Sequence, residues 1–227
     1  MKWIPYGPDA WLLKFAERVG DKAFHRGRAI AAELDRRPPP GLIEYVPAFT
    51  TVLLEFRSGH GNAQELASLV SRLKKVLRVK LPASRPKPIP IIYDGPDLER
   101  VAKRNGLSVE QVCRRHAAVV YKVYALGFSP GFPYLGDLDP RLHTPRLASP
   151  RPRVPAGSVG IGGEHTGIYS VDSPGGWNII GRTTVKLFDA SAAESVVAPA
   201  QVFFLEPGDR VKFVRVPDLG LERGGNR

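Results

Sequence analysis

The sequence GFSPGFPYLGD, residues 127–137, combines three glycines, two prolines and three aromatic residues in one short stretch. Proline fixes the backbone angle φ and glycine permits sharp bends, so this stretch predicts a stiff, tightly bent loop. Because a stiff loop loses little entropy on binding, its aromatic faces suit a ligand-binding surface. The alternative is a rigid connector whose aromatic side chains plug the end of a β-barrel. The residues alone leave both interpretations open.

Short runs rich in β-branched and aromatic residues lie on both sides of this stretch. They predict strands over residues 89–93, 119–126, 159–162, 168–171, 178–180, 184–188, 202–205 and 211–216. The chain contains 23 glycines and 22 prolines, a larger share than the ~12% of an average protein, which favours many tight turns. Many short strands separated by turns predict a closed or nearly closed antiparallel β-barrel.

The first 81 residues show a different pattern, in which strands alternate with amphipathic helices. The predicted order is strand 10–15, helix 21–36, strand 42–46, strand 51–56 and helix 62–79. This βαββα order predicts a small α+β domain in which two helices cover one sheet.

A proline-rich segment, residues 82–88, separates the two patterns and contains three prolines. Since proline lacks a backbone donor, we expect this segment to be an extended linker outside any β-ladder. The predicted domains are therefore the α+β domain, residues 1–81, and the β-barrel domain, residues 89–217. The polar tail, residues 218–227, is expected to be frayed.

Composition limits the classes of protein that this chain can represent. Of its 227 residues, 43% are hydrophobic and 24% are charged, which excludes wholesale disorder. No apolar run approaches the ~20 residues that span a bilayer, and the first residues lack the apolar core of a signal peptide. The single cysteine, Cys113, excludes an intrachain disulfide. These features predict a cytoplasmic protein, and the five histidines lack the paired spacing of metal ligands, so no metal site is predicted.

The net charge of +11 is compatible with a polyanionic partner such as nucleic acid. Residues 97–116 also fit the spacing of a DNA-binding helix-turn-helix, with Gly106 at the turn and Ser108 capping the second helix. However, β-rich runs follow where a supporting third helix is expected. A helical hairpin beside the barrel is therefore the favoured interpretation, and a nucleic-acid partner is not expected.

Arginines next to glycine-rich turns mark a candidate anion site. Arg146, Arg151 and Arg153 precede the turn VPAGSVGIGG, residues 154–163. Unpaired backbone N–H groups in such turns bind anions, and arginine offers a planar fork to phosphate or carboxylate. A second turn, SPGGW at residues 173–177, presents an indole ahead of a further arginine. The alternative is that the first turn is an ordinary glycine-rich hairpin.

Several of these motifs occur together in one known protein family. In order, the chain carries IPIIY (89–93), GLSVE (106–110), LGFSPGFPYLG (126–136), VPAGSV (154–159), TGIY (166–169), SPGGW (173–177) and GRT (181–183). Over about residues 4–216, the chain resembles the family of 5-oxoprolinase B subunits (PxpB), also called allophanate hydrolase subunit 1 or KipI-like. The same module forms subdomains C and D of the carboxyltransferase part of urea carboxylase.

The resemblance implies a fold, an activity and partners. The implied fold is an α+β N-terminal domain followed by a cyclophilin-like antiparallel β-barrel domain. The implied protein is the B subunit of a 5-oxoprolinase, inactive alone, which acts with the C and A subunits to hydrolyse 5-oxo-L-proline to L-glutamate with ATP as co-substrate. Two alternatives stay open, a KipI-like inhibitor that binds a sensor histidine kinase and a subunit that processes allophanate or urea.

Under this resemblance we expect arginines and aromatic rings to enclose one cavity, in which an anion is held while ATP activates the amide oxygen. The expected catalytic residues are His116 and Arg153. The expected anion-binding residues are Arg146, Gly157, Ser158 and Arg182. The expected pocket wall consists of Phe128, Pro130, Phe132, Tyr134, Tyr169, Pro174, Gly175, Gly176 and Trp177. Two positions depart from the family pattern: Ala117, where serine is often found, and His165, where glutamine is often found.

Overall fold

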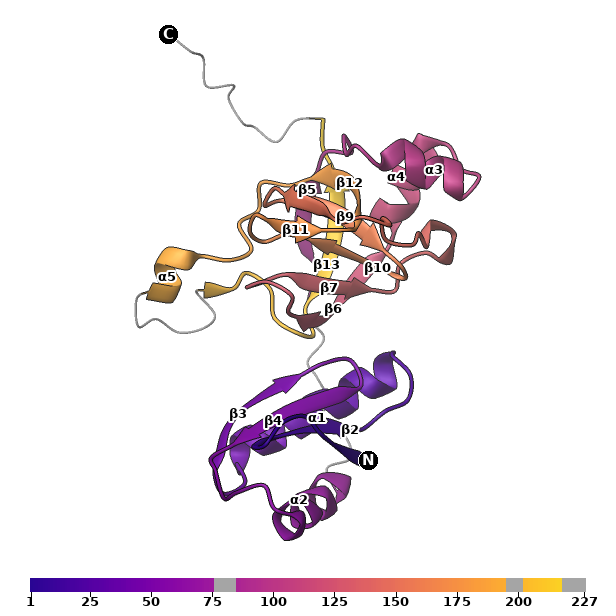
Figure 1. Ribbon diagram of the computed structural model, residues 1–227. Helices are drawn as coiled ribbons and strands as arrows, with labels where there is room; N and C mark the ends of the chain where they lie inside the picture. Colours follow the sequence, from indigo (N-terminus) through magenta and orange to yellow (C-terminus); the bar gives the residue numbers. More distant parts are fainter. Residues whose placement is uncertain (76–84, 195–201, 218–227) are drawn as a thin grey trace. The chain divides into compact units, whose positions relative to one another are not determined.

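The computed structural model describes residues 1–75, 85–194 and 202–217 (Figure 1). The chain divides into two compact units, Met1–Ala83 and Ser84–Arg227. Within the described ranges, every helix is too short or too polar to cross a membrane. The predicted frayed tail, residues 218–227, lies outside the described residues, as do residues 76–79 of the second predicted helix and residues 82–84 of the predicted linker.

The first unit is a four-stranded antiparallel sheet with two helices packed on one of its faces (Figure 1). The strands, in the spatial order β1-β2-β4-β3, are β1 (Lys2–Pro5), β2 (Ala10–Lys14), β4 (Thr51–Phe56) and β3 (Leu42–Pro47). The helices are α1 (Asp21–Arg36) and α2 (Ala63–Lys75). Alternate strand residues such as Leu13 and Leu54 meet Ile30 of α1 and Leu69 of α2 in the core. The sequence analysis does not predict β1, because this short run containing Pro5 shows no clear alternation.

The second unit is built around a seven-stranded sheet that forms a nearly closed barrel. In spatial order its strands are β12 (Asn178–Arg182), β9 (Ser158–Gly162), β10 (His165–Ile168), β7 (Pro133–Gly136), β6 (Val120–Leu126), β13 (Arg210–Arg215) and β5 (Lys87–Ile91). Neighbouring strands are antiparallel except β13 and β5, which run parallel. The sheet is therefore mixed, and the prediction of a purely antiparallel barrel is wrong at this edge. Buried side chains such as Val123, Val159 and Phe213 form the core of this unit.

The two edges of the sheet meet at a single β-bridge. Ile92, just after β5, and Arg182, at the end of β12, exchange backbone hydrogen bonds of 3.0 and 2.9 Å. Gly181 makes this approach possible, because a Cβ atom there would lie 2.3 Å from the carbonyl oxygen of Ile92. The bridge therefore depends on a residue without a side chain.

Shorter elements surround the barrel. They are α3 (Leu98–Arg104), α4 (Val109–Ala118), η1 (Pro140–Leu142), β8 (Arg151–Val154), β11 (Ser173–Gly175) and α5 (Ala190–Glu194). Helices α3 and α4 form the predicted hairpin, which contacts β12 and β13 (Figure 1). Ser108 caps α4 in a reciprocal arrangement with Gln111, which confirms the predicted cap. Strands β8 and β11 pair as a separate two-stranded ribbon.

Several local predictions are wrong. Lys87 and Pro88 do not belong to a linker outside the ladders, because they begin β5; proline is tolerated there since β5 is an edge strand. Residues 184–188 and 202–205 do not form strands and meet only at a bridge between Phe188 and Phe203. The strand predicted over residues 168–171 is also wrong. Strand β10 ends at Ile168, because it pairs with β7 and β9 over His165–Ile168.

We expect Gly181→Ala to lower the free energy of unfolding of the barrel by about 1–3 kcal/mol, because the added methyl group overpacks the bridge. The matched control is Gly127→Ala, where a Cβ would meet no atom within 4 Å. That control is expected to change stability by less than about 0.5 kcal/mol. Urea denaturation monitored by circular dichroism measures both, and equal effects would contradict the closure described above.

Candidate functional site

A groove with a volume of about 320 Å³ lies over the seam where the barrel closes. The loop after β5, the ribbon strand β8 and the ends of β9 and β12 form its walls. Its lining residues are Asp94, Gly95, Pro96, Arg151, Arg153, Val154, Pro155, Ser158, Ile179, Gly181 and Arg182. Three of these are arginines, whose guanidinium groups are of the kind that binds carboxylate and phosphate.

Two of the three arginines form ion pairs at the exposed rim. The Nε atom of Arg182 donates to Asp94 at 2.8 Å. Arg153 donates through Nε and Nη2 to one oxygen of Asp172, at 2.8 and 2.5 Å. The backbone N–H of Ala156 and the guanidinium of Arg153 lower the pKa of Asp172, which is therefore ionised at neutral pH. Because both pairs are exposed to solvent, they contribute little to stability and leave the arginines free to exchange partners.

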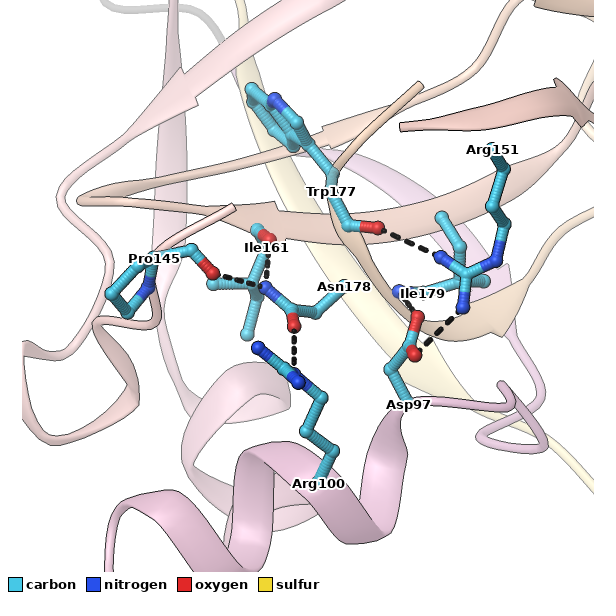
Figure 2. Close-up of polar contacts among 8 residues, drawn as sticks. All are labelled: Asp97, Arg100, Pro145, Arg151, Ile161, Trp177, Asn178 and Ile179. Carbon is cyan, nitrogen blue, oxygen red and sulfur yellow. Dashed lines mark hydrogen bonds and ion pairs between the residues drawn. The ribbon is translucent and has the colours of Figure 1, made fainter. Parts of the chain in front are cut away.

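The third arginine is fixed by a buried carboxylate. Asp97, which is 6% exposed, accepts a hydrogen bond from the backbone N–H of Ile179 at 2.7 Å and one from Arg151 at 2.8 Å. Figure 2 shows that Arg151 also reaches the carbonyl oxygen of Trp177, at 3.4 Å. Arg151 is thus held in one orientation on the wall of the groove.

Asn178, which precedes Ile179 in β12, reinforces the same seam (Figure 2). Its amide nitrogen donates to the carbonyl oxygens of Pro145 and Ile161 at 2.9 and 3.0 Å, and its oxygen accepts from Arg100 at 3.0 Å. A fully buried amide with these partners is satisfied and ties β12 to α3.

The sequence analysis misses two aspartates that pair with arginines of the groove, Asp94 and Asp97. The pattern places Asp97 at the start of the helical hairpin and gives Asp94 no role. The available signal is an Asp-Gly-Pro-Asp sequence directly after a predicted strand, residues 94–97. Nothing in the spacing indicates that this loop meets the arginines of β8 and β12, because that contact depends on closure of the barrel.

The predicted aromatic wall forms a core cluster instead of lining the groove. Phe132, Tyr169 and Trp177 are buried, and Phe132 packs edge-on against both other rings with centroids 5.3 Å apart. Tyr134 contacts Phe132 and Trp177 at the edge of this cluster. For residues 127–137, this packing favours the interpretation of a rigid connector whose aromatic rings pack into the protein.

The groove contains only some of the residues that were expected to enclose one cavity. Arg153, Ser158 and Arg182 line the groove, whereas Phe128 and Pro130 line a separate shallow hollow. The aromatic cluster lies behind the groove and is connected to it through Val154 and Ile179, which belong to both. Arg146 lies over the ring of Trp177 at 5.8 Å and does not line the groove. Pro174, Gly175 and Gly176 shape the β11 turn that carries Trp177 and do not line the groove either.

The predicted cradle of free amides is also wrong. The N–H of Gly157 donates to the carbonyl oxygen of Tyr169 at 2.7 Å, and the N–H of Ser158 donates to that of Pro155 at 3.2 Å. These amides complete the turn and are not available to a ligand. Among the described residues, no group of three or more histidines, cysteines or acidic residues is placed to hold a metal ion.

His116 does not lie at the edge of an anion site. It is completely buried in the barrel core, where its ring packs against Phe213 with centroids 4.6 Å apart. Its Nδ1 atom is 2.8 Å from the hydroxyl of Tyr93, and its Nε2 atom is 2.9 Å from the hydroxyl of Thr166. The two positions that depart from the family pattern, Ala117 in α4 and His165 in β10, do not line the groove.

The hydrogen bonds around His116 fix its tautomer. The hydroxyl of Thr166 donates its one proton to the carbonyl oxygen of Gly160 at 2.9 Å, so it must accept from Nε2–H of His116. Nδ1 then accepts from Tyr93. Burial lowers the pKa of His116 to about 3, so the imidazole is neutral and serves as a satisfied core group.

We expect this histidine to make folding sensitive to acid. Below the unfolded pKa of about 6.5, the unfolded chain binds a proton that the folded chain excludes. The stability that depends on neutral His116 is therefore complete above pH 6.5 and falls as the pH is lowered toward 3, by up to about 1.4 kcal/mol per pH unit. Urea denaturation between pH 7 and pH 4 should show a smaller slope for His116→Gln than for the wild type.

An identical pH dependence in the variant would contradict this assignment. If the variant is too unstable to measure, the tautomer gives a second test on the wild-type protein. Nitrogen NMR should show a protonated Nε2 and an unprotonated Nδ1 down to pH 5, whereas a doubly protonated ring at that pH would overturn the prediction.

Comparison with known proteins relates this architecture to a family. The model of the family described as carboxyltransferase domain, subdomain C and D, matches residues 1–198. The chain is 38% identical to the 5-oxoprolinase B subunit of Bacillus subtilis (strain 168) over 226 residues, which cover 93% of this chain and 91% of the relative. It is 43% identical to the 5-oxoprolinase B subunit of Escherichia coli O157:H7, over 77% of this chain and 78% of the relative.

More distant relatives and a solved structure carry the same module within longer chains. A putative urea carboxylase of Emericella nidulans is 29% identical over 56% of this chain and 10% of its own length. The crystal structure of TTHA0988 matches 92% of this chain with a TM-score of 0.77 and 41% identity, whereas this chain covers 40% of TTHA0988. Since the family model matches most of its residues, this chain belongs to the family of carboxyltransferase domains, subdomains C and D.

Proposed function

We propose that this chain is the B subunit of an ATP-dependent 5-oxoprolinase, a cytoplasmic complex in which it acts with the C and A subunits. The complex would hydrolyse 5-oxo-L-proline to L-glutamate while ATP and water yield ADP and phosphate. The observation that carries the proposal is the 38% identity to a 5-oxoprolinase B subunit across 93% of this chain and 91% of the relative. The two proteins therefore correspond over nearly their whole length.

The occurrence of this module inside longer chains supports the dependence on partners. This chain covers only 40% of TTHA0988, so additional protein precedes or follows the equivalent module there. The relatives that match most of this chain are themselves named as one subunit of a 5-oxoprolinase, which supports action together with other subunits. This reasoning supports a chain that is inactive alone.

The arginine groove supplies chemistry that the reaction needs. A lactam resists attack by water, so its oxygen must be activated, and phosphorylation by ATP achieves this while negative charge accumulates. Both substrates are anions, since 5-oxoproline carries a carboxylate and ATP carries phosphates. Guanidinium groups bind carboxylate and phosphate oxygens through two parallel hydrogen bonds.

Arg153 and Arg182 are the residues that would exchange partners for such an anion. Their bonds to Asp172 and Asp94 are exposed and weak, so a bound carboxylate or phosphate can compete for them. Arg151 would keep its bond to buried Asp97 and present a fixed guanidinium to the same ligand. His116 has no role in this scheme, because its ring is enclosed by the core.

We expect Arg153→Ala and Arg182→Ala each to lower kcat/KM for 5-oxoproline by about tenfold or more, because a hydrogen bond to a charged group contributes about 1.5–3 kcal/mol. The measurement is 5-oxoproline-dependent ATP hydrolysis by the complex reconstituted with the A and C subunits. The matched control is Arg104→Ala, an exposed arginine at the end of α3 that does not line the groove. It should retain the wild-type rate.

Two outcomes would count against this scheme. Unchanged kinetics in both groove variants would remove the arginines from the reaction, and a complex that hydrolyses no 5-oxoproline would remove the activity itself.

The second candidate is a urea-processing subunit, which the similarity to a putative urea carboxylase supports over 56% of this chain. Supplying urea or allophanate in place of 5-oxoproline in the same assay separates the two functions.

A further inference from the structure

The sheet of the first unit has one face that its helices do not cover. Four residues lie on this face as directly paired neighbours across the strands: Ile4 opposite Leu12, Leu12 opposite Leu53, and Leu53 opposite Val46. Successive side chains of a strand point to opposite faces, so these residues point away from α1 and α2. None of them belongs to the hydrophobic core of the unit. We call this set the outer apolar row.

Apolar side chains are exposed both in this row and elsewhere on the sheet. Val46, at the β3 end of the row, is 49% exposed, and Tyr6, just after β1, is 67% exposed. Ile43, which occupies the bulge between Leu42 and Glu44 in β3, is 56% exposed. An apolar surface that continues across all four strands is a feature of interaction sites on soluble proteins.

Like charges flank the outer apolar row at two diagonally opposite corners. On one side, Lys2 of β1 lies directly opposite Lys14 of β2. On the other side, Glu44 of β3 lies directly opposite Glu55 of β4. Like charges at directly opposite positions destabilise an antiparallel sheet. Opposite charges from outside the sheet would therefore stabilise both pairs.

The unit itself does not supply that charge to the glutamates. Within the described part of the chain, neither Glu44 nor Glu55 has an ion-pair or hydrogen-bond partner for its side chain. Lys14 does contact Glu17, at 2.5 Å, but this exposed pair contributes little and Lys2 remains beside it. One corner of the face is thus basic and the opposite corner is acidic.

We propose that this face binds a second copy of the same face, forming a symmetric dimer through the first unit. Consider a two-fold axis that lies in the plane of the face, passes between Leu12 and Leu53, and is perpendicular to the line joining the two charged corners. Rotation about this axis would place the lysine corner of one protomer on the glutamate corner of its partner. The same operation brings the two outer apolar rows together at the centre. A symmetric interface must complement itself, and this pattern of charges does.

The self-complementarity selects a second copy over a different protein. A different protein would need an acidic corner and a basic corner placed to match those of this face, whereas a second copy has both by symmetry. The inference rests only on the first unit and does not depend on the 5-oxoprolinase function. Loss of catalysis and loss of dimerisation are therefore separate results.

Charge reversal in the full-length chain tests the proposal. The variant Lys2→Glu/Lys14→Glu has two acidic corners, and Glu44→Lys/Glu55→Lys has two basic corners. We expect each to raise the dimer dissociation constant at least tenfold, as measured by sedimentation velocity over a concentration series. Mixed in equal amounts, the two variants should form heterodimers with an affinity near that of the wild type, because every corner then meets its opposite.

A matched control and a folding check complete the experiment. Lys74→Glu/Lys75→Glu changes the net charge equally but lies on α2, on the helical side of the sheet, and should leave the dimer intact. Since none of the altered residues is buried, thermal denaturation should show that every variant folds. A wild-type chain that is monomeric at all concentrations would overturn the proposal. So would a dimer that neither reversal weakens, or variants that fail to associate when mixed.

Discussion

The buried carboxylate of Asp97 is the interaction on which the second unit depends. Its two oxygens receive the backbone N–H of Ile179 and the guanidinium of Arg151, so one side chain joins the loop after β5 to β12 and to the ribbon strand β8. These three segments are distant in sequence and meet where the sheet closes on itself. Removing either partner would leave a buried carboxylate without its hydrogen bond, which is strongly destabilising.

Closure of the barrel also creates the arginine groove. The bridge between Ile92 and Arg182 brings the loop that carries Asp94 against the end of β12, and the ribbon adds Arg151 and Arg153. The groove therefore combines one arginine that is held rigidly with two whose partners are exposed. A fixed cation orients an anion, while exchangeable ion pairs let it enter without leaving a buried charge unpaired.

The aromatic motifs and His116 illustrate how chemistry-bearing residues can serve the core. Phe132, Tyr169 and Trp177 pack edge-to-face behind the groove, and their rings support Val154 and Ile179 on its wall. The imidazole of His116 has a hydrogen bond at each nitrogen, and burial holds it neutral. The aromatic rings thus support the groove from behind, whereas His116 belongs to the barrel core.

The amino-acid sequence by itself determined the elements whose periodicity is local. Helix 21–36 and strand 51–56 occur with the predicted bounds, and the hairpin cap at Ser108 was readable because capping depends on residues three apart. The motifs 127–136 and 173–177 were enough to indicate the family. Arg153, expected to be catalytic, and Arg182, expected to bind an anion, were singled out from residue type, and both line the groove.

Only the tertiary structure decided which of these residues share a site. The parallel pairing of β5 with β13, the bridge to β12 and the burial of His116 all arise from contacts between segments far apart in the chain. Asp97 illustrates the reason: spacing shows an acidic residue before a helix, but its partners at Arg151 and Ile179 exist only after the sheet has curled. A side chain's type is written in the sequence, whereas its neighbours, its exposure and its pKa are set by the closed barrel.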